Sequence, residues 1–167
     1  MTSVTFQGNP MTLSGELPSI GDQLPELRFH SDPGTDFSLS TRLDTPLILT
    51  TAPSVDTPVC ANQLLGFEHH LQTMGSDHPP VLFVTRDLPF AIDRFCDERE
   101  IVLVDTASDF RHRDAGERLG LEITELGLLA RTVWIIDTDG TIKYRQVVEE
   151  VADEPSYQSV FDAYQDL

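Results

Sequence analysis

The apolar run Pro46–Ala52 constrains the fold most strongly, because a clear helix start follows it closely. Such a run is typical of a buried strand. Thr57 is a suitable N-cap, and Pro58 suits the first helical position, where its missing N–H would lack a partner in any case. Apolar residues then recur at near-helical spacing, which predicts a helix over about 58–73. A strand joined to a helix by a short loop is a building unit of α/β domains.

Cys60 would be the third residue of that helix. Its sulfur would face backbone N–H groups that have no partner within the helix, at the positive end of the helix dipole. Such a position stabilises the thiolate, which is the nucleophilic form of cysteine. The alternative is an inert buried thiol, the usual state of a free cysteine. The strand, the cap, the proline and the helix start together favour a reactive Cys60.

Strands and helices alternate along the rest of the chain. Apolar runs predict strands over 4–6, 11–13, 27–30, 36–39, 81–84, 101–104, 132–137 and 142–147. Turns are expected at Gly8–Pro10, Asp32–Gly34 and Thr138–Gly140. Helix signals begin near Asp87–Pro89, Arg113 and Glu154–Pro155. We therefore expect one α/β domain over residues 1–167, with a central mixed sheet flanked by helices and an N-terminal β-hairpin.

The charge balance excludes one class of function. The chain has 28 acidic residues against 11 basic ones, Lys143 is its only lysine, and the net charge is −17. No basic stripe is present to neutralise phosphates, so nucleic-acid binding is not expected. The acidic residues are spread along the chain, which predicts a solvated acidic surface. Abundant acid with almost no lysine resembles proteins of salt-accumulating halophiles; the alternative is an ordinary acidic cytosolic protein.

The sequence carries no signal for a membrane or for secretion. No apolar run approaches the roughly 18–20 residues of a membrane-spanning helix, and the N-terminus lacks the features of a leader peptide. A cytoplasmic location is therefore expected. Cys60 and Cys96 are too few for a disulfide scaffold, and in a reducing compartment such a pair is catalytic, redox-active or metal-binding. A metal site is the weakest option because neither cysteine has further ligands at finger spacing.

The segment around Cys60 also resembles that of a known protein family. The pattern P-x-x-x-T-x-x-C, formed by Pro53, Thr57 and Cys60, resembles the active-site signature of peroxiredoxins. Further segments, in the same order, resemble the thiol peroxidase branch of atypical two-cysteine peroxiredoxins: Phe6–Pro10, Asp87–Ala91, Arg94–Cys96 and Leu129–Arg131. The resemblance spans essentially the whole chain. It implies a thioredoxin-like fold and thiol-dependent reduction of hydroperoxides, without a cofactor.

By matching position, the resemblance also implies roles. Cys60 would be the peroxidatic cysteine and Cys96 the resolving cysteine of the same chain. Thr57 and Arg131 would be polar partners of Cys60, and Pro53 would shield the pocket from water. Thioredoxin is implied as reductant, and a homodimer as assembly. Taken singly, Thr57 could be a plain helix cap, Arg131 a surface charge and Cys96 an idle core thiol.

Three departures from the family pattern stand out. Pro58 replaces a common glycine, the loop at 76–80 is slightly longer, and Asp97-Glu98 follow Cys96 where a small residue is common. This acidic pair is expected to raise the pKa of Cys96. Because a disulfide needs Cα atoms within about 7 Å, both cysteine segments are expected to unwind locally before they meet.

Other functions remain open from the sequence. A redox sensor would use the same sulfenic acid to pass oxidation to a partner protein. A thiol–disulfide oxidoreductase is disfavoured because that chemistry normally uses C-x-x-C, and residue 63 is a glutamine. Apolar residues expected near the pocket (Phe90, Leu128 and Leu129) hint at alkyl or lipid hydroperoxides, although ordinary core packing explains them equally well.

Overall fold

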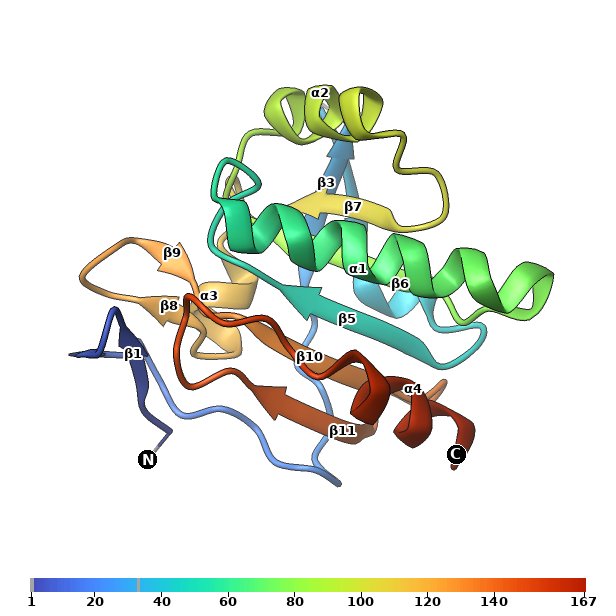
Figure 1. Cartoon of the computed structure of the whole chain (residues 1–167). Coiled ribbons are helices and arrows are strands. Elements are labelled where there is room, and N and C mark those ends of the chain that lie inside the picture. Colours follow the sequence, from blue (N-terminus) through green and yellow to red (C-terminus); the bar gives the residue numbers. More distant parts are fainter. Residues whose placement is uncertain (1, 33) are drawn as a thin grey trace.

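The computed structural model describes residues 2–32 and 34–167, so Pro33 of the expected Asp32–Gly34 turn lies outside the described residues (Figure 1). Its centre is a seven-stranded sheet in the order β11-β10-β5-β6-β7-β3-β4. Strands β5 (Leu47–Thr51), β6 (Val81–Thr85) and β7 (Asp105–Ser108) are parallel, whereas the outer strands pair antiparallel. The expected mixed sheet is therefore confirmed.

The outer strands follow the hairpin signals of the sequence. They are β3 (Arg28–Asp32), β4 (Thr35–Ser38), β10 (Thr132–Ile136) and β11 (Ile142–Val147). A small separate pair, β8 (Glu122–Ile123) and β9 (Leu128–Leu129), was not expected from the sequence. The segments η1 (Leu39–Arg42) and η2 (Gly75–Asp77) are short 3-10 helices.

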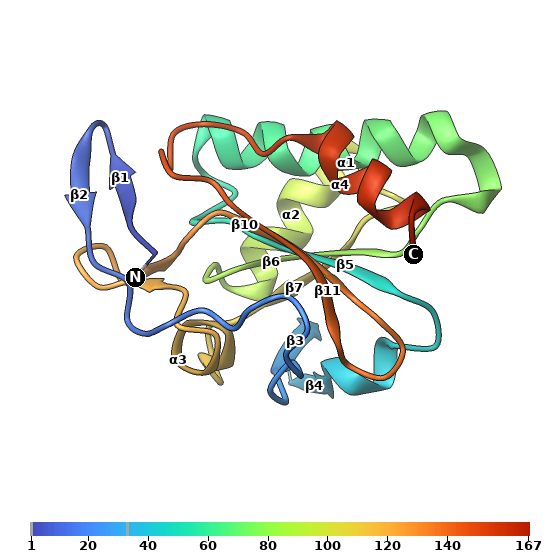
Figure 2. The ribbon, with the colours of Figure 1, turned by 90° about the horizontal axis from the view of Figure 1, so that it is seen from below.

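Helices cover both faces of the sheet. The long α1 (Pro58–Met74) and the C-terminal α4 (Tyr157–Gln165) lie on one face, and the short α3 (Asp114–Arg118) lies on the other (Figure 2). Alternation along β5 explains this division: Ile48 packs in the cluster with α1, while Leu47 and Leu49 pack in the cluster with α3. Helix α2 (Pro89–Arg99) packs near β7 and β3. No helix within 2–32 and 34–167 is long and apolar enough to cross a membrane.

The N-terminal hairpin is confirmed, but its expected turn at Gly8–Pro10 is wrong. Strands β1 (Val4–Phe6) and β2 (Asn9–Met11) are joined by Gln7 and Gly8, which have φ of 52° and 78°. Two positive φ angles in a two-residue loop are those of a type I′ turn, whose twist matches the flanking strands. The second strand therefore begins two residues earlier than the apolar pattern suggested.

The strand expected over 101–104 is also wrong. Those residues form a loop, the Val102 side chain is 78% exposed, and the strand β7 begins only at Asp105. The physical reason is a competing acceptor. The N–H groups of Val102, Leu103 and Val104 donate to the carboxylate of Glu68 on α1 instead of to a neighbouring strand.

Candidate active site around Cys60

The start of α1 places Cys60 as the sequence predicted. Thr57 is the N-cap, with an extended backbone, and Pro58 is the first helical residue. Cys60 is then the third residue of the helix and is fully buried. The Thr57 hydroxyl does not cap the helix; it donates to the Ser54 carbonyl at 3.0 Å. This hydrogen bond joins the two ends of the short loop 54–57 that precedes α1.

Two donors from different parts of the chain reach the Cys60 sulfur. The Ser54 N–H lies 3.5 Å from Sγ, and Nη2 of Arg131 lies 3.4 Å from it. A thiolate is stabilised by such donors, because charge-assisted hydrogen bonds are stronger than neutral ones. Both donors are thus directed at the atom that would carry the negative charge of a thiolate.

Arg131 is held rigidly in the interior, so the surface-charge alternative is wrong. Its side chain is buried directly before β10. Nε and Nη2 donate to the Val151 carbonyl at 3.1 and 2.7 Å, and Nη1 donates to Oε1 of Gln63 at 2.5 Å. A guanidinium fixed by three hydrogen bonds to two acceptors presents the second N–H of Nη2 to the sulfur in one geometry.

Gln63 is a site residue that the sequence reasoning missed. It is fully buried, and its Nε2 donates to the Thr50 hydroxyl of β5 at 2.6 Å while its Oε1 accepts from Arg131. The available signal was its position three residues after Cys60, which puts both side chains on one face of the helix.

Asp87 is a second missed residue, and it holds the loop that carries the Ser54 donor. Its carboxylate accepts from the Ser54 hydroxyl at 2.7 Å and from the Val55 N–H at 2.8 Å. Thr85 Oγ1 donates to the same carboxylate at 2.7 Å. The end of β6 is therefore fastened to the loop before Cys60.

A largely apolar cavity of about 380 Å³ is lined by Thr57, Pro58 and Val59, which directly precede Cys60, and by Arg131, which donates to the Cys60 sulfur. It brings together three of the predicted site residues, Pro53, Thr57 and Arg131, although they come from separate segments. The rest of its wall comprises Phe6, Gln7, Pro58, Val59, Leu126, Leu128, Val151 and Ala152. Leu128 thus lines the cavity as expected. The same expectation is wrong for Phe90, which is 67% exposed on α2, and for Leu129, which is buried in the core.

The N-terminal hairpin reaches this cavity, and Glu150 is one of the residues that hold it there. The carboxylate accepts from the Thr5 hydroxyl at 2.8 Å and from the N–H groups of Gln7 and Gly8 at 3.0 Å each. These donors, first the Gly8 N–H, lower the pKa of Glu150 to about 2. The following residue, Val151, is the one whose carbonyl holds Arg131.

Cys96 lies on another helix and packs against the core cluster that contains Cys60. It sits half-buried in α2, with its sulfur 3.9 Å from the Thr106 hydroxyl of β7, and both cysteines carry free thiols. Burial and then the carboxylates of Asp93 and Asp97 raise the pKa of the Cys96 thiol. A separate hollow of about 410 Å³ lies between the first turn of α1 and the last turns of α2. A Cys60–Cys96 disulfide therefore requires movement.

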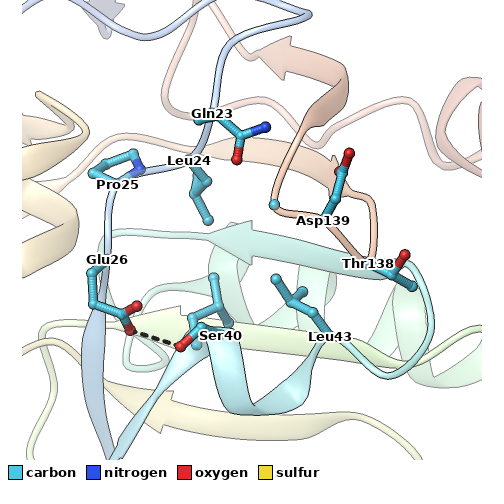
Figure 3. Close-up of a pocket in the computed structure, with 10 residues that line it drawn as sticks. Gln23, Leu24, Pro25, Glu26, Ser40, Leu43, Thr138 and Asp139 are labelled. Carbon is cyan, nitrogen blue, oxygen red and sulfur yellow. Dashed lines mark hydrogen bonds between the residues drawn. The ribbon is translucent and has the colours of Figure 1, made fainter.

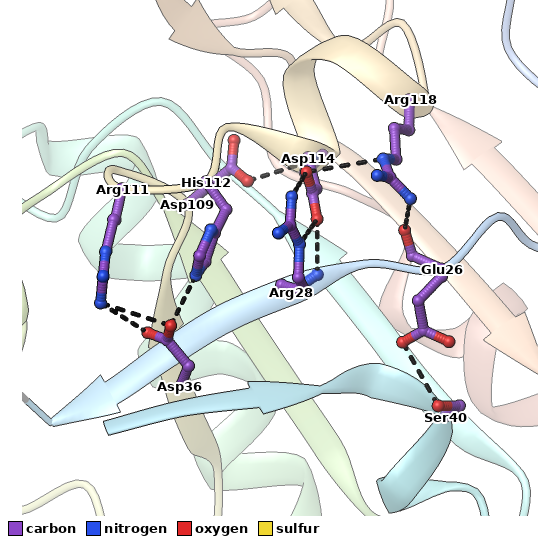
Figure 4. A network of polar contacts seen from close by, with 10 residues as sticks. Glu26, Arg28, Asp36, Ser40, Asp109, Arg111, His112, Asp114 and Arg118 are labelled. Atoms are coloured by element: carbon purple, nitrogen blue, oxygen red, sulfur yellow. Dashed lines mark hydrogen bonds and ion pairs between the residues drawn. The ribbon is translucent and has the colours of Figure 1, made fainter. Parts of the chain in front are cut away.

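Other polar features of the molecule are structural. A hollow of about 250 Å³ between Gln23–Glu26, η1 and the β10–β11 turn contains no cysteine or histidine (Figure 3). Arg28 and Arg118 pair with Asp114, and Arg111 and His112 pair with Asp36, which ties β3 and β4 to the region of α3 (Figure 4). Among the described residues, no group of three or more His, Cys, Asp or Glu side chains could hold a metal ion.

The chain resembles known proteins over nearly its whole length. The family model described as Redoxin matches residues 19–161. The thiol peroxidase of Aquifex aeolicus is 38% identical over 168 residues, covering 99% of this chain and 98% of that protein. The thiol peroxidase of Vibrio cholerae is 35% identical, covering 95% and 97%. The chain belongs to the thiol peroxidase family of peroxiredoxins. It is a thiol peroxidase enzyme, as the signature around Cys60 predicted.

Solved structures support the same fold for this thiol peroxidase. A peroxiredoxin-like protein from Aquifex aeolicus superimposes with a TM-score of 0.91 at 37% identity, covering 98% of this chain and 96% of that one. A thiol peroxidase from Chromobacterium violaceum gives a TM-score of 0.86 at 23% identity, covering 98% and 95%. The predicted thioredoxin-like fold is confirmed.

Proposed function

We propose that this thiol peroxidase reduces hydroperoxides through a sulfenic acid on Cys60 and a Cys60–Cys96 disulfide that thioredoxin reduces. The observation that carries the proposal is the pair of donors on the buried Cys60 sulfur, the Arg131 guanidinium and the Ser54 N–H, beside a largely apolar cavity. Donors fixed around a nucleophile before reaction stabilise charge without reorganisation.

In the first step, the Cys60 thiolate attacks the terminal oxygen of the hydroperoxide. The O–O bond breaks, the sulfur gains the OH group, and the alkoxide leaves as alcohol after taking up a proton. Arg131 lines the cavity and would stabilise the negative charge on the departing oxygen. Thr57 also lines the cavity, and its oxygen retains lone pairs that can accept a hydrogen bond from the peroxide.

In the second step, the Cys96 sulfur attacks the sulfenic sulfur, the S–O bond breaks and water leaves with the Cys96 proton. A dithiol such as thioredoxin then restores both thiols by exchange. Such a cycle fits a reducing compartment, which agrees with the expected cytoplasmic location. The homodimer implied by the family resemblance stays part of the proposal, and sedimentation analysis checks it.

The cavity wall supports organic hydroperoxides as preferred substrates. Phe6, Leu126, Leu128 and Val151 offer an alkyl chain an apolar surface beside the reacting sulfur, which hydrogen peroxide is too small to contact. A lower KM for cumene hydroperoxide than for hydrogen peroxide is the expected result.

The decisive experiment measures peroxide-dependent NADPH consumption coupled through thioredoxin and its reductase. Wild type should turn over, Cys60→Ser should be inactive, and Cys96→Ser should react once without recycling by thioredoxin. A wild-type protein that oxidises once and never turns over with any dithiol would favour the redox sensor instead.

A further inference from the structure

Glu68 is a buried carboxylate that the proposed reaction does not use. It lies in the middle of α1 and is only 4% exposed. Its Oε1 accepts from the N–H groups of Val102 and Leu103 at 3.0 and 3.1 Å, and its Oε2 accepts from those of Leu103 and Val104 at 2.9 Å each. Burying a carboxylate is unfavourable unless it is hydrogen-bonded, and here three successive backbone donors satisfy it.

The loop bound by Glu68 directly follows the helix that carries Cys96. Figure 1 shows the connection from α2 to β7 running beside α1. Helix α2 ends at Arg99, and the Ile101 N–H still donates to the Cys96 carbonyl at 3.0 Å. The anchored residues 102–104 therefore begin where the local hydrogen bonds of α2 stop.

The other end of α2 is anchored in the same manner. Asp87 precedes the helix by two residues, and its carboxylate binds the Ser54 hydroxyl and the Val55 N–H at 2.7 and 2.8 Å. Two carboxylates thus fasten the two ends of the Cys96 segment to the parts of the chain that hold Cys60. Between these anchors, the Cys96 sulfur lies 3.9 Å from the Thr106 hydroxyl of β7, and the residue packs against the core cluster that contains Cys60.

We propose that Glu68 is a positioning residue that fixes the C-terminal limit of the moving Cys96 segment, so that on this side of the disulfide the rearrangement is confined to residues 88–101. The inference rests on the proposed two-cysteine reaction. A segment held at both ends keeps Cys96 on a short tether, and a shorter tether maintains a higher effective concentration at the Cys60 sulfenic acid. The anchor therefore favours disulfide formation over attack by a second peroxide, which would give a sulfinic acid.

Three variants separate the anchor from simple charge effects. Glu68→Gln replaces one acceptor oxygen by an NH₂ group that faces the loop donors. Val102→Pro removes one N–H donor from a residue whose side chain is 78% exposed, and it leaves the Glu68 charge in place. Asp77→Asn removes one exposed carboxylate outside the Cys96 segment and serves as the control. A thermal unfolding curve shows that each variant is folded.

The first measurement is amide hydrogen exchange in the reduced protein and in the peroxide-generated disulfide form. In wild type and Asp77→Asn, the amides of 102–104 should stay protected in both forms, while those of α2 lose protection in the disulfide form. In Glu68→Gln the amides of 102–104, and in Val102→Pro the remaining amides of 103 and 104, should exchange faster even in the reduced protein. Loss of protection at 102–104 in the wild-type disulfide form would overturn the proposal.

The second measurement is the fate of the Cys60 sulfenic acid, followed by mass spectrometry during a peroxide titration. The rate of the first oxidation should be unchanged in all variants. The ratio of disulfide to sulfinic acid should fall by about two- to tenfold in both anchor variants and not in the control. An unchanged or increased ratio of disulfide to sulfinic acid in both anchor variants would overturn the proposed role of Glu68 but leave the peroxidase proposal intact. A wild-type protein that forms no Cys60–Cys96 disulfide defeats both.

Discussion

At the scale of single residues, the rate at which the Cys60 sulfur reacts with hydroperoxide is expected to depend on how firmly Arg131 is held. The guanidinium donates to the sulfur at 3.4 Å, and its other N–H groups are bound by the Val151 carbonyl and by Gln63. A lysine at this position could reach only one of these acceptors well, because its ammonium lacks the planar fork of donors.

Arg131→Lys should therefore slow the reaction of Cys60 with hydroperoxide by about 10²-fold, a loss typical of removing one fixed donor from a reacting centre. Stopped-flow single-turnover oxidation measures this rate. Arg145→Lys is the matched control, because Arg145 donates to the Leu17 and Pro18 carbonyls and has no contact with the site. An equal loss in both variants would argue against a specific role for Arg131.

Gln63→Leu tests the support behind Arg131. The substitution keeps the volume roughly constant but leaves the Thr50 hydroxyl and Nη1 of Arg131 without this partner. Unfolding free energy should fall by about 1–3 kcal/mol for the unpaired buried groups. The rate of Cys60 oxidation should fall less than in Arg131→Lys, because Val151 still holds the guanidinium. Urea unfolding and the same stopped-flow assay measure the two effects, and unchanged stability would contradict the prediction.

At the scale of elements, the N-terminal hairpin forms part of the cavity wall, and the Glu150 carboxylate binds it there through three hydrogen bonds. The pKa of Glu150 is lowered from 4.5 to about 2, first by the Gly8 N–H. A carboxyl with a lower pKa in the folded state stabilises that state above its unfolded pKa. This stabilisation is lost as the pH falls from about 4.5 to about 2.

Glu150→Gln should consequently lower the thermal stability at pH 7, and the difference from wild type should shrink towards pH 2. The KM for cumene hydroperoxide should rise, whereas the KM for hydrogen peroxide should change little, because only the larger substrate would contact the hairpin wall in the proposed binding mode. Glu149→Gln is the neighbouring control, because it removes one charge while the anchoring carboxylate stays in place. A stability difference that persists at pH 2 would assign the effect to something other than the Glu150 charge.

At the scale of the whole molecule, the net charge of −17 opposes compactness through self-repulsion. Salt screens this repulsion, with a Debye length that falls from about 10 Å at 0.1 M to about 3 Å at 1 M. The midpoint of thermal unfolding should therefore rise steadily between 0.1 and 2 M KCl. Sucrose at matched osmolality is the control for solvent exclusion. A midpoint insensitive to KCl would support an ordinary acidic protein over the halophile-like alternative.

The sequence by itself determined those features of the structure that depend on interactions between residues close together in the chain. The cap and the proline fixed the start of α1 and hence the position of Cys60, because helix initiation is a local event. A local pattern gives a wrong prediction where a distant residue competes for the backbone. The apolar pattern of 101–104 predicts a strand, but N–H groups of this segment donate to the Glu68 carboxylate, more than thirty positions away.

Only the tertiary structure decided how the site is assembled. Arg131 and Cys60 are 71 positions apart, and Arg131 and Gln63 are 68 positions apart. Their contacts therefore cannot be predicted from residue spacing along the chain. The family resemblance named Arg131, but its burial and its binding by Val151 follow from the packing of the 148–152 loop against the sheet. How α1 and α2, which carry Cys60 and Cys96, lie relative to each other is likewise decided by the packing of the helices on the sheet. Long-range contacts of this kind depend on how the elements pack together, which residue order alone does not encode locally.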